Sequence, residues 1–205
     1  PGVFKTGHWV GNPLRKAFTE QAQPAARFAG RSGPLRVLVV GGSLGAKALN
    51  DNVPQALALM SASKRPAVIH QSGAKQIEAL RANYQAAGVE AELVPFIEDM
   101  ATAFAQADVV ICRAGASTVT ELAAVGVAAM LVPFPFAVDD HQTTNAQFLV
   151  SAGGGWLMPQ AELTPQGLAD WLSGLDRSQL VAVAEKASAQ KKTNATREVL
   201  MACEE

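Results

Sequence analysis

The chain has 205 residues and a mass of 21.4 kDa, with 17 basic and 18 acidic residues and a formal net charge of −1. Hydrophobic residues make up 49% of the chain and charged residues 17%, which excludes a disordered protein because so apolar a sequence can bury a core. The near-neutral balance argues against a protein that holds nucleic acid by its overall charge.

Short apolar runs alternate along the chain with longer helical patterns. Residues 1–34 carry Gly, Pro and Arg with few periodic signals and are interpreted as a connector into the first strand. The strands are predicted at Leu35–Val40, Ala67–His70, Glu92–Phe96, Asp108–Cys112, Ala129–Val132 and Trp156–Met158. Helices are predicted at Ala46–Met60, Lys75–Ala86, Met100–Gln106, Thr118–Val125 and His141–Ser151. Thr164 and Pro165 are predicted to cap and open a helix to Leu172, and a last helix is predicted over Ser178–Met201.

The predicted strands are apolar almost without interruption, as in LRVLVV and DVVIC. Such strands are typical of a parallel sheet that is covered on both faces. Strand–helix alternation with short loops therefore predicts a doubly wound α/β sheet. Ligands of such sheets bind beyond the carboxyl ends of the strands, so the strand-to-helix loops are the candidate site.

The loop after the first strand reads GGSLGA, from Gly41 to Ala46. A glycine-rich turn before a helix start directs backbone N–H groups toward an anion, and Ser43 adds a hydroxyl, so phosphate binding is one interpretation. A tight turn that only connects strand to helix is the other. The loop is not a P-loop, because no Gly-Lys-Ser/Thr follows, and a nicotinamide site is disfavoured because Ile69–Gln71 offers no acidic residue for a ribose.

The loop after the fourth strand reads CRAGASTVTE and brings a second glycine turn to a helix start. Glu121 suits two hydrogen bonds from a ribose diol, but Thr118 and Glu121 also fit a capping box, and the local sequence leaves both interpretations open. Arg113 is a candidate to screen a diphosphate or, equally, a solvated loop charge.

Two further loops contribute weaker candidates. Phe96 and Ile97, after the third strand, could wall a flat base or simply belong to the core. The loop PFPFAVDDHQTTNA, after the fifth, carries His141 and the amides Gln142 and Asn145, which suit a hydroxylated ligand or a plain surface helix. No metal is predicted, because adjacent residues such as its DDH triplet rarely converge on one ion. Two glycine-lined helix starts, a candidate ribose carboxylate and an amide loop are predicted on one sheet edge, and together they make a nucleotide sugar the natural candidate ligand.

Five motifs occur in an order that matches a known family: GNPLR, GGSLGA, VPFIEDM, CRAGASTVTEL and DDHQTTNA. By these motifs the chain resembles the carboxyl-terminal, donor-binding half of the MurG-type glycosyltransferases, bacterial enzymes that transfer N-acetylglucosamine to undecaprenyl-diphospho-muramoylpentapeptide. The resemblance implies a GT-B architecture of two Rossmann-like halves. It also implies that residues 1–34 connect from a missing amino-terminal domain and that residues 35–205 form the donor domain with carboxyl-terminal helices.

The resemblance also implies an activity and a setting. The reaction would be an inverting hexosyl transfer from UDP-N-acetylglucosamine in peptidoglycan synthesis, serving cell shape and division, at the cytoplasmic side of the bacterial inner membrane as a peripheral protein. The missing half would carry the lipid acceptor and the catalytic base, so this chain alone would be inactive and holds no catalytic residue. No cofactor, metal or nucleic acid is expected.

The site residues implied by the resemblance fall on the same loops. Arg15 would contact the donor, Ser43 the diphosphate, Ile97 uracil through its backbone, Glu121 the ribose and Gln142 the sugar. The full substrate-binding set expected is Arg15, Gly42, Ser43, Ile97, Arg113, Ala116, Ser117, Thr118, Val119, Thr120, Glu121, His141 and Gln142. The chain departs from many relatives at Leu44 and Ala114, which stand in place of Gln and Ser, and from some members at His141, which stands in place of Gln.

Three alternatives stay open at this point. The first is a GT-B glycosyltransferase or an epimerase that uses another UDP-sugar. The second is a non-catalytic nucleotide-binding module. A dinucleotide oxidoreductase ranks last, because no acidic residue follows the second strand.

Overall fold

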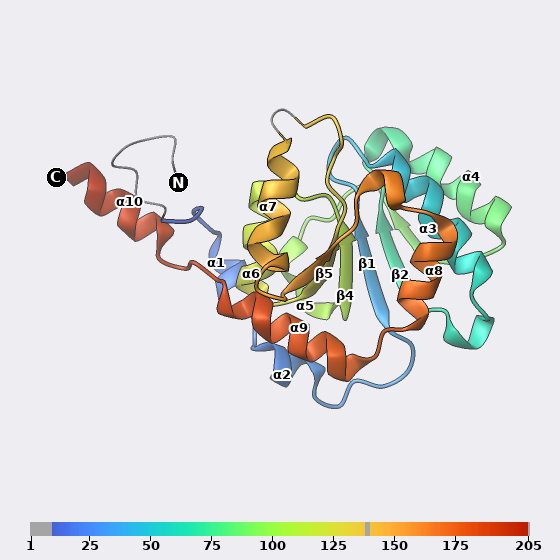
Figure 1. The fold of residues 1–205 in the computed structure, drawn as a ribbon, viewed down its shortest axis with the longest axis horizontal. Coiled ribbons are helices and arrows are strands. Elements are labelled where there is room, and N and C mark those ends of the chain that lie inside the picture. Colours follow the sequence, from blue (N-terminus) through green and yellow to red (C-terminus); the bar gives the residue numbers. More distant parts are fainter. Residues whose placement is uncertain (1–9, 138–139, 205) are drawn as a thin grey trace.

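Six parallel strands form one sheet at the centre of the molecule, in the order β3-β2-β1-β4-β5-β6 (Figure 1). The structure, a computed structural model, describes residues 10–137 and 140–204. The strands are β1 (Arg36–Val40), β2 (Ala67–Gln71), β3 (Glu92–Val94), β4 (Val109–Cys112), β5 (Ala128–Leu131) and β6 (Gly155–Leu157). All six predicted strands are confirmed to within two residues, and so is the doubly wound α/β fold.

Helices connect the strands and flank them at both ends of the chain. They are α1 (Lys16–Thr19), α2 (Pro24–Phe28), α3 (Lys47–Leu59), α4 (Ile77–Ala87), α5 (Met100–Gln106), α6 (Ala116–Val125), α7 (His141–Val150), α8 (Pro165–Ser173), α9 (Arg177–Ala189) and α10 (Ala195–Glu204). Single 3-10 turns lie at η1 (Ala62–Lys64), η2 (Ala74–Gln76) and η4 (Gln160–Glu162). The predicted cap of α8 is confirmed, because the Thr164 hydroxyl accepts a hydrogen bond from the Gly167 N–H at 3.1 Å.

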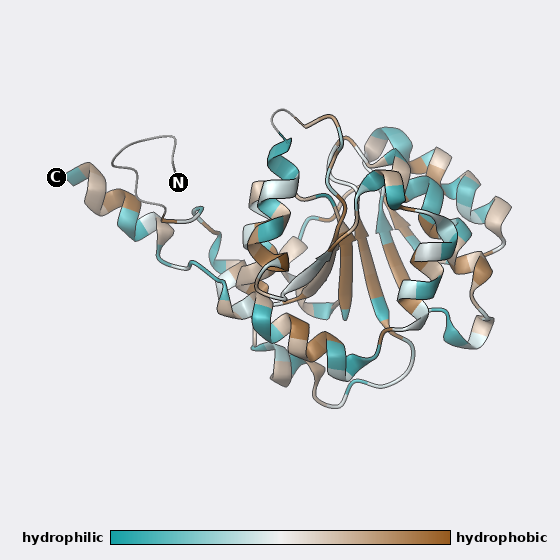
Figure 2. Ribbon diagram, in the orientation of Figure 1, coloured by the Kyte–Doolittle hydropathy of each residue, from teal (hydrophilic) through white to brown (hydrophobic). Residues whose placement is uncertain are grey.

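Successive side chains of a strand point to opposite faces of the sheet, and both faces are buried because helices cover them. Val37 and Val39 of β1 pack into a cluster with α3, α4 and α8, whereas Leu38 and Val40 pack into a second cluster with α5, α6 and α7. Figure 2 shows that the central strands are mainly hydrophobic, whereas the helices around them carry many hydrophilic residues. The sheet is therefore the rigid element that fixes where its loops emerge.

Residues ahead of β1 pack on the sheet domain through two short helices. Helix α1 contacts α6 and α2 contacts α9, and Phe18 and Phe28 are buried, one in each core cluster. Few periodic signals mark these helices in the sequence, because each helix spans little more than one turn. The division of the chain at residue 35 stays a prediction.

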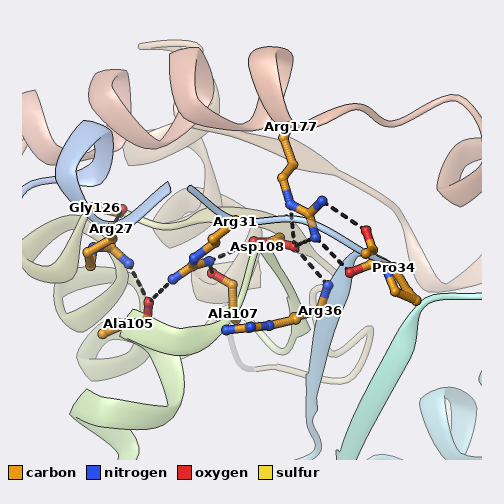
Figure 3. A network of polar contacts seen from close by, with 10 residues as sticks. Arg27, Arg31, Pro34, Arg36, Ala105, Ala107, Asp108, Gly126 and Arg177 are labelled. Carbon is orange, nitrogen blue, oxygen red and sulfur yellow. Dashed lines mark hydrogen bonds and ion pairs between the residues drawn. The ribbon is translucent and has the colours of Figure 1, made fainter. Parts of the chain in front are cut away.

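A buried carboxylate joins this leading segment to the sheet and to α9 (Figure 3). Asp108 is fully buried and accepts hydrogen bonds from Arg31 at 2.6 Å, from Arg177 at 3.0 Å and from the Arg36 N–H at 2.9 Å. Arg177 also donates to the carbonyls of Gly33 and Pro34. The carboxylate therefore holds three segments that are distant in the sequence.

Arg27 extends the same network at its edge. Its guanidinium donates to the carbonyls of Ala105, Val125 and Gly126. Burial, together with the neighbouring charge of Arg31, lowers the pKa of Arg27 to about 10. The segment before β1 is thus fixed to the ends of α5 and α6 as well.

The helix predicted over Ser178–Met201 is wrong in one respect: it is two helices, α9 and α10, separated by residues 190–194. The break includes Thr193 and Asn194, and residues of these two types disfavour helix interiors because their side chains can compete with the backbone for hydrogen bonds. Helix α10 projects away from the body (Figure 1), and Val199, Leu200 and Met201 on it are exposed. Among the described residues, no helix combines the length and apolar character needed to cross a membrane.

Candidate functional site

All six strands are parallel, so the loops that follow them emerge at the same, carboxyl edge of the sheet. The loops after β1, β3, β4 and β5, together with the helices they open, carry the expected site residues apart from Arg15. Strands β1 and β4 are neighbours at the centre of the sheet, with their connections leading to opposite sides. This arrangement is where open α/β sheets bind ligands.

The loop after β1 has a backbone that only glycine accommodates at two positions. Gly42 and Gly45 adopt φ of 80° and 76°, and a Cβ added to Gly45 would lie 2.2 Å from the Ser72 carbonyl oxygen. Ser43 is exposed between them, and α3 begins at Lys47 with no side-chain cap. The first N–H groups of α3 therefore remain available to an anion.

The side-chain amide of Gln71 is hydrogen-bonded to the backbone of this loop. Its Oε1 accepts from the Gly42 N–H at 3.0 Å, and its Nε2 donates to the Gly42 carbonyl and to the Pro95 carbonyl, both at 3.0 Å. Gln71 ends β2 and is 2% exposed. One buried side chain thus contacts the loops after both β1 and β3.

A series of hydrogen-bonded side chains also supports the loop after β1. Gln76 Nε2 donates to the Leu44 carbonyl at 2.9 Å, and Asn50 Nδ2 donates to Gln76 Oε1 at 2.8 Å. His70 lies between Asn50 Oδ1 and the Tyr84 hydroxyl, each at 3.0 Å. Burial lowers the pKa of His70 to about 3, so the imidazole is neutral, donating from Nε2 to Asn50 and accepting at Nδ1 from Tyr84.

The loop after β4 opens α6 without a side-chain cap. Gly115 is the N-cap, so Thr118 lies at the third helical position and cannot form a capping box with Glu121. That interpretation of the Thr118–Glu121 spacing is wrong. Ala116 and Ser117 are exposed, and the N–H groups of the first three residues have no partner within the helix.

Two expected site residues on α6 are engaged within the protein. The Val119 side chain is 3% exposed in the core, and its N–H donates to the Gly115 carbonyl at 3.0 Å. The Thr120 hydroxyl donates to the Ala116 carbonyl at 2.8 Å and accepts from Asn12 Nδ2 at 3.1 Å. The helix start therefore offers a ligand the backbone of residues 116–118 rather than these two side chains.

Glu121 lies half-buried one turn further along α6. Burial raises the pKa of its carboxyl, and the charge of Arg15 opposes that rise. Arg15 also helps to lower the pKa of Asp99, after the hydrogen bonds from Thr102, so its charge acts on carboxylates from two loops. Arg15 is exposed, with its guanidinium 5.0 Å from the centre of the Phe18 ring.

The loop after β3 carries Phe96 and Ile97 at the same edge. Ile97 is partly buried against the second core cluster, whereas Phe96 is 64% exposed. The two interpretations of this pair thus divide between the two residues: Ile97 packs on the core, and the Phe96 ring is free to face a ligand.

Arg113 braces the loop after β5. Its guanidinium donates to the carbonyls of Val132 and Pro133 at 3.2 and 3.1 Å and to Gln160 Oε1 at 2.6 Å. It also lies 5.4 Å from the centre of the Phe134 ring. Arg113 is therefore not a solvated loop charge, and burial lowers its pKa.

Gln142 and Asn145 tie α7 to the loop after β4. Gln142 Oε1 accepts from the N–H groups of Phe134 at 3.0 Å and Ala114 at 3.3 Å, and Asn145 Nδ2 donates to the Ala114 carbonyl at 3.1 Å. These contacts fix the Gln142 carbonyl inward and leave its Nε2 group as the donor that a ligand could meet. His141 is exposed at the first residue of α7, and Asp139 of the DDH triplet lies outside the described residues.

Metal-binding geometry is not found within residues 10–137 and 140–204, where no group of three or more His, Cys, Asp or Glu side chains converges. Cys112 is buried in its strand and Cys203 is exposed on α10. The polar groups that gather at the sheet edge are instead backbone N–H groups, amides and single charges.

Sequence reasoning missed the amides that support these loops, the buried Gln71 and the partly exposed Gln76, and the contact of Asn12 with α6. A signal was present: His70 and Gln71 are polar residues that end a strand otherwise suited to burial. Buried polar side chains are almost always hydrogen-bonded, so this pair should have indicated a nearby backbone in need of partners.

Comparisons with known proteins agree with this geometry. The family model of the glycosyltransferase family 28 C-terminal domain matches residues 36–200. The chain is 67% identical over all 205 residues to a UDP-N-acetylglucosamine–N-acetylmuramyl-(pentapeptide) pyrophosphoryl-undecaprenol N-acetylglucosamine transferase of Paracidovorax citrulli, and 64% identical to a protein of the same name from Azoarcus. It covers 58% of each relative, so it spans little more than half of their length.

Solved structures show the same likeness. The crystal structure of Acinetobacter baumannii MurG matches with a TM-score of 0.86 at 41% identity, over 98% of this chain and 57% of that one. Anabaena HepE, solved with UDP and glucose, matches with a TM-score of 0.64 at 15% identity over 94% of this chain and 55% of its own, a likeness of fold alone. The expected resemblance to the carboxyl-terminal half of the MurG-type enzymes is confirmed.

Proposed function

The chain belongs to the glycosyltransferase family 28 C-terminal domain family, and from this membership we propose that it binds UDP-N-acetylglucosamine as the donor half of an N-acetylglucosaminyltransferase. The acceptor would be the undecaprenyl-diphospho-muramoylpentapeptide of peptidoglycan synthesis, in keeping with the names of relatives that match the whole chain. The observation that carries the proposal is the meeting of two uncapped, glycine-lined helix starts with a partly buried carboxylate at one sheet edge.

Each part of the donor has a chemical counterpart on these loops. The first N–H groups of α3 and α6, with the Ser43 hydroxyl, suit the diphosphate. Glu121 suits the ribose hydroxyls, because a carboxylate accepts two hydrogen bonds. Phe96 and the backbone of Ile97 suit the uracil, and the free Nε2 of Gln142 with His141 suits the sugar.

The chemistry asked of this half is electrostatic. Transfer with inversion leaves UDP carrying additional negative charge, and helix N-termini placed in advance around the diphosphate stabilise that charge as it develops. Arg15 adds a full positive charge at the same edge. The base that activates the acceptor would lie in an amino-terminal half, so this chain alone would bind donor without transferring it.

Exposed apolar groups support the presence of that second half. Leu44 is 82% exposed and Phe136 80% exposed, both on loops at the donor edge, and α10 leaves the body with Val199 to Met201 uncovered. Large apolar side chains gathered at one edge indicate a surface that another domain or a ligand covers. We propose that the whole protein acts as a peripheral membrane enzyme on the cytoplasmic side of the bacterial inner membrane, where it would serve cell shape and division.

Isothermal titration calorimetry of the full-length protein with UDP-N-acetylglucosamine tests the proposal. We expect saturable binding that weakens strongly in Glu121→Ala. The control Glu20→Ala, which removes an exposed carboxylate that forms an ion pair with Lys16, should leave binding unchanged. Equal affinity of the Glu121→Ala variant and the parent would refute the ribose role. Preference for UDP-glucose or UDP-galactose would instead point to a transferase for another sugar.

A further inference from the structure

We propose that Gln71 is a positioning residue that holds the diphosphate loop after β1 and the uracil loop after β3 in a fixed relation. The inference rests on the proposed function, because it concerns how the same donor site is built. Gln71 would not touch the nucleotide. It would act through Gly42 and Pro95, whose backbone groups it binds.

The side-chain amide of Gln71 is hydrogen-bonded through both its nitrogen and its oxygen. Both Nε2 hydrogens are used, one on the Gly42 carbonyl and one on the Pro95 carbonyl, and Oε1 accepts the Gly42 N–H, all at 3.0 Å. The Gln71 backbone carbonyl accepts the Gly41 N–H at 3.0 Å as well. The side chain therefore binds both the backbone N–H and the backbone carbonyl of Gly42, the residue before Ser43, while it also binds the carbonyl of Pro95, the residue that precedes Phe96.

The neighbours of Gln71 in the sheet explain why its amide needs these hydrogen bonds. Gln71 lies beside Val40 of β1 and Val94 of β3, so its neighbours at the same level are apolar. Burying an amide in such surroundings is unfavourable unless its hydrogen bonds are made. The sheet itself gains nothing from an amide here. Without Gln71, the Gly42 N–H and the Pro95 carbonyl would lose their hydrogen-bond partner, whereas the Gly42 carbonyl would keep only its bond from the Gly45 N–H.

The loop after β1 is held independently at its far end, which makes the role of Gln71 specific. Gln76 binds the Leu44 carbonyl and is itself fixed through Asn50 and His70. Loss of Gln71 would thus free the Gly42 end of the loop and the Pro95 end of its neighbour while α3 stays in place. We expect the affected property to be the relative placement of the base and diphosphate contacts.

The test compares Gln71→Met, which keeps the length of the side chain and removes its hydrogen bonds, with Gln71→Glu, which places a carboxylate against two carbonyl oxygens. Arg65→Met is the matched control: it removes side-chain hydrogen bonds to the Leu57 and Met60 carbonyls at the other end of α3. UDP and uridine are titrated into each full-length protein, by calorimetry and by NMR respectively, and each thermal midpoint is measured.

We expect both Gln71 variants to bind UDP and uridine about tenfold or more weakly than the parent, a difference of about 1.4 kcal/mol. Ser43→Ala should weaken UDP but not uridine, because only the diphosphate contact is lost. Arg65→Met should bind both as the parent does, even where its thermal midpoint falls as far as that of the Gln71 variants.

The outcomes distinguish a failure of the positioning role from a failure of the proposed function. A folded Gln71→Met or Gln71→Glu protein that binds UDP and uridine within twofold of the parent overturns the positioning role and leaves the proposed function standing. A parent that binds no uridine nucleotide overturns the proposed function and this inference with it. Weakening of Arg65→Met to the same degree as the Gln71 variants shows a general effect of stability and overturns the positioning role.

Discussion

Replacing Asp108 by Ala should destabilise the domain more than any exposed charge change. The carboxylate is fully buried and accepts from Arg31, from Arg177 and from the Arg36 N–H. Its removal leaves the Arg31 and Arg177 side chains, which are only 9% and 22% exposed, without a counter-charge. Breaking a buried ion pair in this way costs about 3–5 kcal/mol, because the remaining charges stay desolvated.

Urea unfolding followed by circular dichroism measures this loss. With a urea dependence of about 2–3 kcal/mol/M for a domain of this size, the midpoint should fall by about 1–2 M. Asp108→Asn should fall less, since the amide oxygen still accepts hydrogen bonds although the charge is gone. Glu20→Ala, which removes the exposed partner of Lys16 at 3.9 Å, should leave the midpoint unchanged.

A midpoint for Asp108→Ala within the error of the parent would show that the three segments in Figure 3 are held by packing alone. A loss in Asp108→Asn as large as that in Asp108→Ala would show that the charge, and not the hydrogen bonds, carries the stabilisation.

Three further predictions concern the donor edge. Burial lowers the pKa of His70 to about 3, below its unfolded value of about 6.5. The neutral imidazole therefore stabilises the fold fully above about pH 6.5, and this stabilisation is lost as the pH falls. Between about pH 6.5 and 5 the free energy of unfolding should fall by about 2 kcal/mol. Urea midpoints should show that this part of the pH dependence disappears in His70→Gln, and an unchanged slope would contradict the assignment. Burial raises the pKa of Glu121 above its ordinary value, so uridine affinity measured by NMR should fall as the pH is lowered toward that pKa and the carboxylate loses its charge, and Glu121→Gln should bind weakly with no such dependence. Gly45→Ala should lose at least about 2 kcal/mol more in urea unfolding than Gly42→Ala, because both have positive φ but only at Gly45 does the added Cβ meet a carbonyl oxygen at 2.2 Å; equal losses would mean that the loop moves to accept the methyl group.

The strand order of the fold could not be read from the sequence, but its elements could. Continuous apolar runs such as Val109–Cys112 identified every strand, because strands buried on both faces carry little other than apolar residues. Helix ends were harder to predict. Helix α6 begins at Ala116 rather than at Thr118, because Gly115 supplies the N-cap through its backbone and leaves no side-chain signature.

The site loops were predictable because glycine-rich turns after strands have few structural explanations. The supports beneath them were not. Gln71 and Gln76 are distant in the sequence from the loop to which they are hydrogen-bonded. Their roles therefore depend on how the strands pair and not on sequence spacing. Arg113 was ambiguous for the same reason, since its acceptors Val132 and Pro133 belong to a neighbouring strand end.

The strand order has one consequence for how ligand binding would be felt across the molecule. The loops after β3, β1, β4 and β5 are adjacent in space, yet about a hundred residues separate the first from the last along the chain. A nucleotide on this edge can be held only when the whole sheet is assembled, so partly opened forms would have no affinity for it. Its binding energy then adds to complete opening of the domain. Amide groups in β6 and α8, which carry none of the expected site residues, should therefore exchange with deuterium more slowly once UDP is bound.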